Sequence, residues 1–480
     1  MKDRLPEGPP SRQASGPHSR LPWLLAAGCV LVIFIALLSL RKDRNATAPS
    51  VSADNPPPAA TGGAAPSARD WFPARRSSPR STVEPAPTAT EIVSNKVAQF
   101  AQSRRKLAHA MAEHFKLAVP DEVERFFDAA EAGRYDEMKA IYQSLRQQRE
   151  NGGDKSWYGP HWRTIIETQG TADAAHDWPA QKLLDYGNAV LGSLRPGMVY
   201  VGGTDPGCFI PTLLNETSDG DRHIVLTQNA LADGTYLDYL GFLYGERMTT
   251  LTKDDSQRMF QEYLADAQKR FGHDQQFPNE PRQIRPGEDV RVIENKVQVS
   301  GQVPVMAINE NLLQTLMKNT PGVSFALEES FPFRSTYANA APLGPIMELG
   351  VQDPQNALTA DRAAQSVAYW QATEQQLLAD PDASGSPETL RAYSKMATSQ
   401  AHLFADRSFN REAEQAYRVA TEICPSSTEA VFGYVSLLIG QARFEDAIPI
   451  AENAVKASAE TRENRQFRDL LEQLQRKAKR

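Results

Sequence analysis

The chain has 480 residues, of which 41% are hydrophobic and 23% charged. At roughly 150 residues per domain, this length accommodates about three domains with sizeable cores. Acidic residues exceed basic ones by 59 to 52, and the net charge of -7 excludes an extensive nucleic-acid surface, which needs a clustered basic excess. The three cysteines exclude a disulfide framework and a cysteine-rich zinc module, so we expect Cys208 and Cys424 to be free thiols.

The first 40 residues contain a candidate membrane anchor. Residues 1–20 are polar and rich in proline, and we expect a disordered tail there. Leu21–Leu40 has 20 residues without a charge. As a helix this segment would be about 30 Å long, enough to cross the hydrocarbon core of a bilayer. We therefore predict a single membrane-spanning helix, with a lipoprotein signal cleaved before Cys29 and a removed signal peptide as the alternatives.

Basic residues lie on both sides of this segment. The flanks carry Lys2, Arg4, Arg12 and Arg20 before it, and Arg41, Lys42 and Arg44 after it. The small excess on the N-terminal side favours a cytoplasmic N-terminus. We therefore expect a cell-membrane protein whose C-terminal part is extracytoplasmic.

Residues 41–90 have the composition of a linker. Nine prolines occur between positions 45 and 90, among alanine, serine, threonine and glycine. Such a segment buries too little apolar area to offset the entropy of ordering it. We predict an extended linker between the membrane and the folded part.

Residues 91–150 have a helical pattern. Apolar side chains recur at helical spacing up to Phe115, and Pro120 ends that helix. Asp121 and Glu124 have the spacing of a capping box for the next helix. The stretch that follows predicts a helical hairpin with its turn at Gly133 and Arg134.

Residues 155–350 alternate between strand and helix patterns. Runs of β-branched residues predict strands at 198–203, 223–228, 289–301 and 323–330, and helical patterns occur at 179–194, 236–248 and 254–271. This alternation predicts an α/β module with a partly parallel sheet. The strict alternation within 289–301 favours a hairpin at an edge.

Residues 356–480 return to helix, and small residues recur there at a spacing of 34. Ala413 corresponds to Ala447, and Ala420 to Ala454. Small side chains at these positions let two antiparallel helices approach closely, while larger ones fill the space beside them. The residues that we expect to pack the two hairpins are Ala401, Phe404, Ala413, Tyr417, Ala420, Leu438, Phe444, Ala447 and Ala454.

This pattern resembles the tetratricopeptide repeat, a helix–turn–helix unit of about 34 residues. The resemblance covers about 395–460, and 461–480 has the composition of a solvating end helix. It departs from the repeat at Ala397 and Val431, which stand at the usual tryptophan position, and at Pro449 inside a helix. The resemblance implies a surface for peptides or partner proteins, although such repeats can be purely architectural.

Two clear repeats are too few to form a stable array alone. We therefore expect them to pack on the α/β module or on the 91–150 hairpins. The hairpin at 122–146 is similar to a third, degenerate unit.

One loop in the α/β module is a candidate ligand site. The stretch 195–216 predicts a strand, a glycine-rich turn and a helix, and the turn contains Gly203, Thr204, Asp205 and Gly207. The start of the helix offers free N–H groups to an anion, and Asp205 suits a sugar hydroxyl or a metal. The alternative is that Thr204 or Asp205 caps the helix and the glycines only make the bend. Neither G-x-G-x-x-G nor a Walker loop is present.

The same region resembles the soluble C-terminal module of bacterial multi-spanning mannosyltransferase-like membrane proteins. The resemblance rests on GGTDPGCF (202–209), HIVLTQNAL (223–231), TYLDYL (235–240) and FALEESFPFRSTYANAAPLGPIMEL (325–349). The acidic pair of that family is reduced here to Asp205, and the multi-spanning catalytic part has no counterpart. The resemblance therefore implies a shared accessory module, and no catalytic residue is carried over.

Other polar groups favour structural roles. We expect Glu328 and Glu329 to be solvated or capping, and Asp254 with Asp255 to open a helix. His161, His176 and His223 lack metal-ligand spacing, and WYGPHW (157–162) is typical of a core corner. We therefore expect neither a metal nor a cofactor.

Two functions follow from these observations. The first is a single-pass, membrane-anchored envelope protein that acts as a non-enzymatic scaffold, binding other proteins through its helical repeats. The alternative is a glycan- or nucleotide-sugar-related enzyme or accessory protein with its ligand site at the 202–209 loop.

Overall fold

A computed structural model describes residues 86–151, 159, 161–203, 205–293, 296–328, 339–458 and 463–479. The predicted tail, the candidate membrane span Leu21–Leu40 and nearly all of the linker lie outside these residues. Within the described ranges, no helix is both long enough and apolar enough to cross a bilayer.

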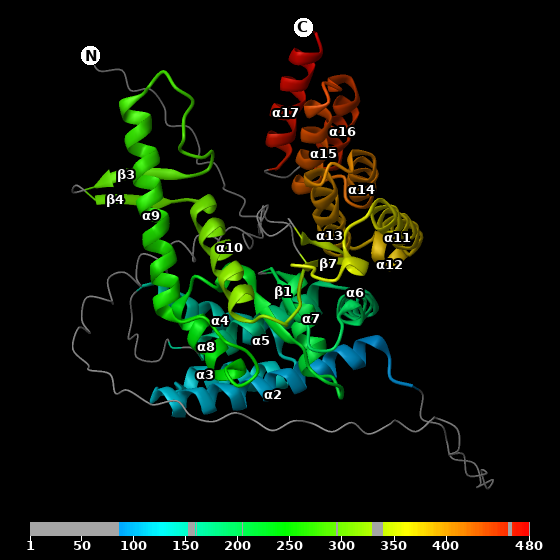
Figure 1. Ribbon diagram of the computed structural model, residues 1–480. Coiled ribbons are helices and arrows are strands. Elements are labelled where there is room, and N and C mark those ends of the chain that lie inside the picture. Colours follow the sequence, from blue (N-terminus) through cyan, green and yellow to red (C-terminus); the bar gives the residue numbers. More distant parts are fainter. Residues whose placement is uncertain are drawn as a thin grey trace, which may run out of the picture.

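The described chain is mostly helical, with a small mixed sheet in its middle (Figure 1). The first helices are α2 (Ala89–Phe115), α3 (Asp121–Glu131), α4 (Tyr135–Glu150), α5 (Trp162–Asp177) and α6 (Ala180–Ser193). The middle part contains β1 (Val199–Gly202), α7 (Pro206–Glu216), β2 (Ile224–Thr227), η1 (Gln228–Ala230), α8 (Gly234–Tyr244), α9 (Lys253–Gln276), β3 (Asp289–Ile293), β4 (Lys296–Ser300), α10 (Gln302–Asn319), β5 (Phe325–Leu327), β6 (Ala341–Leu343) and β7 (Ile346–Leu349). The last part contains η3 (Pro354–Asn356), α11 (Ala360–Ala379), α12 (Pro381–Ser384), α13 (Pro387–Asp406), α14 (Asn410–Ile423), α15 (Thr428–Gly440), α16 (Phe444–Ala457) and α17 (Glu463–Ala478).

The main sheet has the strand order β2-β1-β5-β7-β6. β1 is parallel to both β2 and β5, and Val201 pairs with Leu226 on one side and Leu327 on the other. β7 runs antiparallel to both β5 and β6. The prediction of a partly parallel sheet is therefore confirmed, whereas the β6–β7 hairpin, which turns at Gly344 with a φ of +59°, was not predicted.

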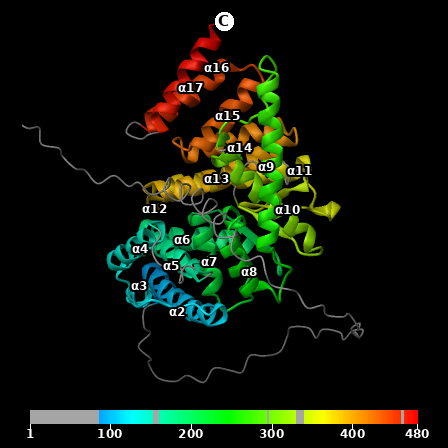
Figure 2. The same cartoon turned by 90° about the vertical axis from the view of Figure 1, so that its left-hand side faces the viewer.

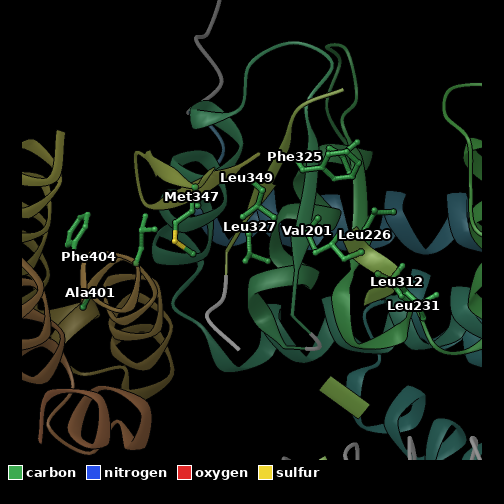
Figure 3. Packing of buried hydrophobic residues seen from close by; sticks show 14 of the residues in the cluster. Val201, Leu226, Leu231, Leu312, Phe325, Leu327, Met347, Leu349, Ala401 and Phe404 are labelled. Carbon is green, nitrogen blue, oxygen red and sulfur yellow. The ribbon is translucent and has the colours of Figure 1, made fainter. Parts of the chain in front are cut away.

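Helices cover both faces of this sheet, because alternate strand residues point to opposite sides. On one face, Val201, Leu226 and Leu327 pack with Leu231 and Leu312 (Figure 3). The same cluster extends past Met347 to Ala401 and Phe404 of α13 (Figure 3). On the other face, side chains of β1 and β5 pack against α6 and α7, and the cluster there includes Tyr200, Ala326, Tyr186 and Ile210.

The strands β3 and β4 form the antiparallel hairpin predicted for 289–301, but this hairpin is a separate two-stranded sheet, so the prediction that it lies at an edge of the main sheet is wrong. Together with α9 it makes a projection that rises from the sheet-containing body, which we call the arm (Figure 1). β4 packs against α9 and α10. Thr252 caps α9 in a capping box with Asp255, so the predicted helix start at Asp254 and Asp255 is confirmed.

Three helical hairpins turn in the same way. The second residue after the first helix has a positive φ in each, at +68° in Gly133, +63° in Ser408 and +59° in Ala442. Ser408 and Ala442 are 34 positions apart, and after each of them a single N-cap residue precedes the second helix. The three turns also share a backbone hydrogen bond of 2.9 Å spanning five residues: Arg134 to Ala129, Phe409 to Phe404, and Arg443 to Leu438.

The last two hairpins stack in sequence, and each helix from α13 to α17 packs against the next one. We call these five helices the array; they rise from the body beside the arm (Figures 1 and 2). The helix α17 covers the end of the array, where Phe467 stacks on Phe432 of α15 with 6.0 Å between ring centroids.

One predicted helix cap is wrong. The N-cap residue of α3 is Pro120, and no side chain caps this helix. A capping box is present instead at the start of α2, between Thr88 and Glu91.

Candidate functional site

The loop 202–209 connects β1 to α7. Asp205 is the N-cap residue of α7, and its carboxylate accepts a hydrogen bond from the backbone N–H of Gly207 at 3.1 Å. Thr204 lies outside the described residues. The capping role that we weighed against a ligand role for Asp205 is therefore present.

This loop lies at a topological switch point of the sheet. β2 follows β1 through α7 and pairs with one side of it, whereas β5 comes much later in the chain and pairs with the other side. In open α/β sheets, ligands bind at such points, outside the carboxyl ends of the strands. We call the residues gathered here the switch-point cluster: Tyr186, Gly203, Asp205, Gly207 and Glu328.

Glu328 directly follows β5 and is only 2% exposed. Its carboxylate accepts one hydrogen bond from the Tyr186 hydroxyl at 2.7 Å and another from the backbone N–H of Gly203 at 3.3 Å. The prediction that Glu328 is solvated or capping is therefore wrong. Because helices cover both faces of the sheet, a residue at the end of a central strand is enclosed. Glu329 lies outside the described residues.

Gly207 allows the loop to approach this carboxylate closely. A Cβ atom at this position would lie 1.8 Å from a carboxylate oxygen of Glu328. The Tyr200 hydroxyl donates a hydrogen bond to the carbonyl oxygen of Gly207 at 2.6 Å and holds the loop from the other side. Burial, together with the Glu328 charge, raises the pKa of Tyr186 well above its ordinary value, so this phenol stays protonated and remains a donor.

The first helix of the array crosses the same edge of the sheet. On α13, Lys395 forms an ion pair with Asp205. The ring of Tyr393, also on α13, meets the ring of Tyr186 edge to face, with 5.4 Å between the centroids. From Ala392 to Ala401, every residue of α13 except Lys395 is buried. The array is therefore fused to the α/β module, and the prediction that it packs there is confirmed.

Gln400 makes a second set of contacts between α13 and the sheet. Its amide donates to the carbonyl oxygens of Gly344 at 2.8 Å and Ile346 at 3.0 Å, at the turn between β6 and β7. Its own carbonyl oxygen accepts from the indole N–H of Trp370 on α11 at 3.1 Å. These bonds satisfy a buried amide and fix α13 against the hairpin of β6 and β7.

A second buried polar cluster lies at the carboxyl end of β2. Glu167 on α5 forms ion pairs with Arg104 of α2 at 2.8 Å and with Arg163 at 3.1 Å. It also accepts a hydrogen bond from the Tyr239 hydroxyl at 2.7 Å, and Arg163 reaches Thr227, the last residue of β2. These contacts join α2, α5, α8 and the sheet, and the paired charges compensate one another inside the core.

The thiol beside this cluster is not activated. Cys208 is buried, and its sulfur lies 3.2 Å from the Thr227 hydroxyl. Burial raises its pKa to about 11, so the reactive thiolate is scarce at neutral pH. Cys424 is also a buried free thiol, so the prediction for both cysteines is confirmed.

The predicted histidines lie in unrelated places. Burial lowers the pKa of His161 to about 4, while His176 stacks on Tyr135 at 3.9 Å and His223 contacts the Met198 carbonyl oxygen at 3.2 Å. Among the residues that the structure describes, no group of three or more His, Cys, Asp or Glu is placed to hold a metal ion.

Comparison of the chain with protein-family models, curated proteins and solved structures gives no match.

The predicted repeat-packing residues lie between the helices of the array. Eight of them are at most 2% exposed. Phe444, at the start of α16, is half-buried and lies 5.7 Å from the Lys477 ammonium of α17. The buried residues are Ala401, Phe404, Ala413, Tyr417, Ala420, Leu438, Ala447 and Ala454.

One face of the array is partly open. Helical spacing places Lys395, Thr398, His402 and Ala405 along one side of α13. The residues 34 positions later in the sequence lie along the matching side of α15. We call the latter the α15 stripe: Glu429, Phe432, Ser436 and Ile439. Lys395 is paired with Asp205 and Thr398 is fully buried, whereas Glu429 and Ser436 are exposed.

Sequence reasoning missed Tyr186, Arg163 and Lys395 as members of these clusters. Nothing local marks them, because each meets its partner only through the tertiary fold. A usable signal was the polar or glycine residue directly after each parallel strand, namely Gly203, Gln228 and Glu328. Such residues converge at the edge where parallel strands end.

Proposed function

We propose that the protein is a membrane-anchored envelope scaffold that binds another protein through the α15 stripe of its helical array. Leu21–Leu40 supplies the anchor and 41–90 the linker that separates the folded part from the bilayer. The folded part is extracytoplasmic in this proposal, and the array is of the tetratricopeptide type. The α/β module serves as the base on which the array is built.

The observation that carries this proposal is that the equivalent sides of α13 and α15 differ in their exposure to solvent. The matching side of α13 is tied to the protein's own α/β module through the Lys395–Asp205 ion pair, and Thr398 beside it is fully buried. The α15 stripe, one repeat further, presents Glu429 and Ser436 to solvent, while Phe432 between them stacks on Phe467 of α17. An array that uses its first repeat for attachment leaves its second repeat for a partner.

A photocrosslinking experiment tests this assignment in intact cells. A photoreactive benzoylphenylalanine replaces Ser436 on the stripe in the full chain. A matched chain carries the same group in place of Asn453, which is exposed on α16 outside the stripe. We expect a discrete crosslinked product from position 436 and none from position 453.

Charge reversal then tests whether the product depends on the stripe. Glu429→Arg should abolish the crosslink from position 436, because it reverses the charge beside the contact. Glu445→Arg, at an exposed position of α16, is the matched control and should leave the crosslink unchanged. Identical products from positions 436 and 453, or no product from position 436, would contradict the proposal.

The alternative function, a glycan or nucleotide-sugar site at 202–209, is favoured by one specific observation. A buried carboxylate, Glu328, stands at the switch point and bonds to Tyr186 and Gly203. In the same loop, Asp205 is already paired with Lys395. Sugar nucleotides that raise the melting temperature of the wild type, but not of Glu328→Gln, would support this function over the scaffold.

A further inference from the structure

The strand β3 ends in two exposed apolar side chains. Val292 is 49% exposed and Ile293 is 46% exposed. Within the described ranges, the other large hydrophobic residues exposed to a similar degree are Phe277 and Leu378, and they are isolated along the sequence. An adjacent pair of exposed β-branched residues is therefore unusual for this molecule, whose apolar side chains are otherwise collected in three core clusters.

These two residues lie at the outer end of the arm's hairpin. Ile293 pairs with Lys296, so they stand at the end where β3 turns into β4. Figure 1 shows this end pointing away from the body. Successive strand residues face opposite sides, so the exposure of both Val292 and Ile293 means that both sides of the strand end are open. The preceding Arg291 side chain is 70% exposed, with its guanidinium 2.7 Å from Asp289.

The chain outside the structure limits what can reach this end. The uncharged run ends at Leu40 and α2 begins at Ala89, so 88 − 40 = 48 residues separate the two. If these residues form the linker that their composition predicts, a chain of this length would span roughly 40 Å on average, comparable to the size of the folded part. In the proposed anchored protein, the bilayer is therefore the one extended surface that is tethered to the folded part and that the arm can meet.

We propose that Val292 and Ile293 form a membrane contact that docks the arm on the lipid surface. The inference rests on the proposed membrane anchor. Two half-exposed aliphatic side chains bind a bilayer only weakly by themselves, as short apolar anchors do. The anchor makes the contact intramolecular, and the resulting high effective concentration compensates for the low intrinsic affinity. Docking the arm fixes the orientation of the array relative to the membrane, which a free linker alone would leave variable.

The test uses the full chain in lipid vesicles and an environment-sensitive dye on a single cysteine. The background carries Cys29→Ala, and Cys208 and Cys424 are buried and unreactive towards the dye. Ile293→Cys places the dye on the arm, and Leu378→Cys is the matched control, because Leu378 is 45% exposed on α11. Val292→Cys provides a second arm position, and circular dichroism checks that each variant is folded.

We expect nitroxide-labelled lipids to quench the dye at 293 and 292 and to leave the dye at 378 bright. Equal quenching at 293 and 378 in chains that float with the vesicles would overturn the membrane contact. The proposed anchor would still be supported, because the chains float. A dye at 293 that is shielded from a water-soluble quencher but not quenched by lipid would assign the hairpin to a protein contact, which also overturns the proposal. If the chains do not float with the vesicles, both the proposed membrane anchor and the membrane contact of the arm are contradicted.

Discussion

Lys395 and Asp205 form an ion pair although 190 positions separate them in the sequence. Asp205 is the N-cap of α7 at the switch point of the sheet, and Lys395 lies on the first helix of the array. The pair therefore joins the two parts that the sequence presents as separate domains. Its position also explains why the first repeat has no open face where it meets the sheet.

The coupling of this pair is measurable. Asp205→Asn keeps the helix cap and removes the charge, and Lys395→Met removes the partner while keeping most of the side chain's length. Because both side chains are partly solvated, we expect a coupling energy of about 0.5–1 kcal/mol from a double-mutant cycle of urea denaturation. A coupling energy of zero would mean that the pair does not contribute to holding the array on the α/β module.

The Gly207 position tolerates no side chain. Gly207→Ala would place a methyl group against the Glu328 carboxylate, and we expect a loss of about 1–3 kcal/mol of unfolding free energy. Gly192→Ala on α6 is the matched control, since nothing lies within 4 Å of its added Cβ. That substitution should be neutral or stabilising, because alanine favours helix. Chemical denaturation of both variants measures the difference, and an equal effect of the two substitutions would contradict the prediction.

Substitutions at two of the equivalent hairpin turns should change the free energy of unfolding in opposite directions. Ala442→Gly should raise the unfolding free energy by roughly 0.5–1 kcal/mol, because it relieves a positive φ on a residue with a Cβ. Gly133→Ala should lower it by a similar amount through strain alone, as no atom lies within 4 Å of the added Cβ. Thermal melts of the two variants measure this. Shifts of the melting temperature in the same direction would contradict the prediction.

The contact between α11 and α14 is expected to depend on pH. Burial and the neighbouring Glu422 raise the pKa of Glu374 to about 7 from an ordinary value of 4.5. Because the folded state binds this proton more tightly, its contribution to stability is complete below pH 4.5 and is lost as pH rises through 7. Glu374→Gln should therefore raise the melting temperature relative to wild type at pH 8 and not at pH 4.5. The exposed Glu445→Gln is the control, and a gain for Glu374→Gln that is the same at both pH values would contradict the assignment.

The sequence predicted individual elements better than the relations between them. Runs of β-branched residues predicted β1, β2, β5 and the arm hairpin, and alanines at a spacing of 34 predicted the stacked hairpins. The burial of Glu328 was missed, because a local pattern does not reveal that helices cover both faces of the strand before it. Lys395 was missed for a similar reason, since its partner Asp205 comes close only when the array docks.

The function rests on whether the α15 stripe binds a protein, and hydrogen exchange tests this most directly. The partner captured by crosslinking at position 436 is purified and added to the full chain, and amide exchange is followed by mass spectrometry with and without it. The account predicts added protection over 428–440, with no change over 199–216 around the switch point. Protection confined to 199–216, or none over 428–440, would contradict it.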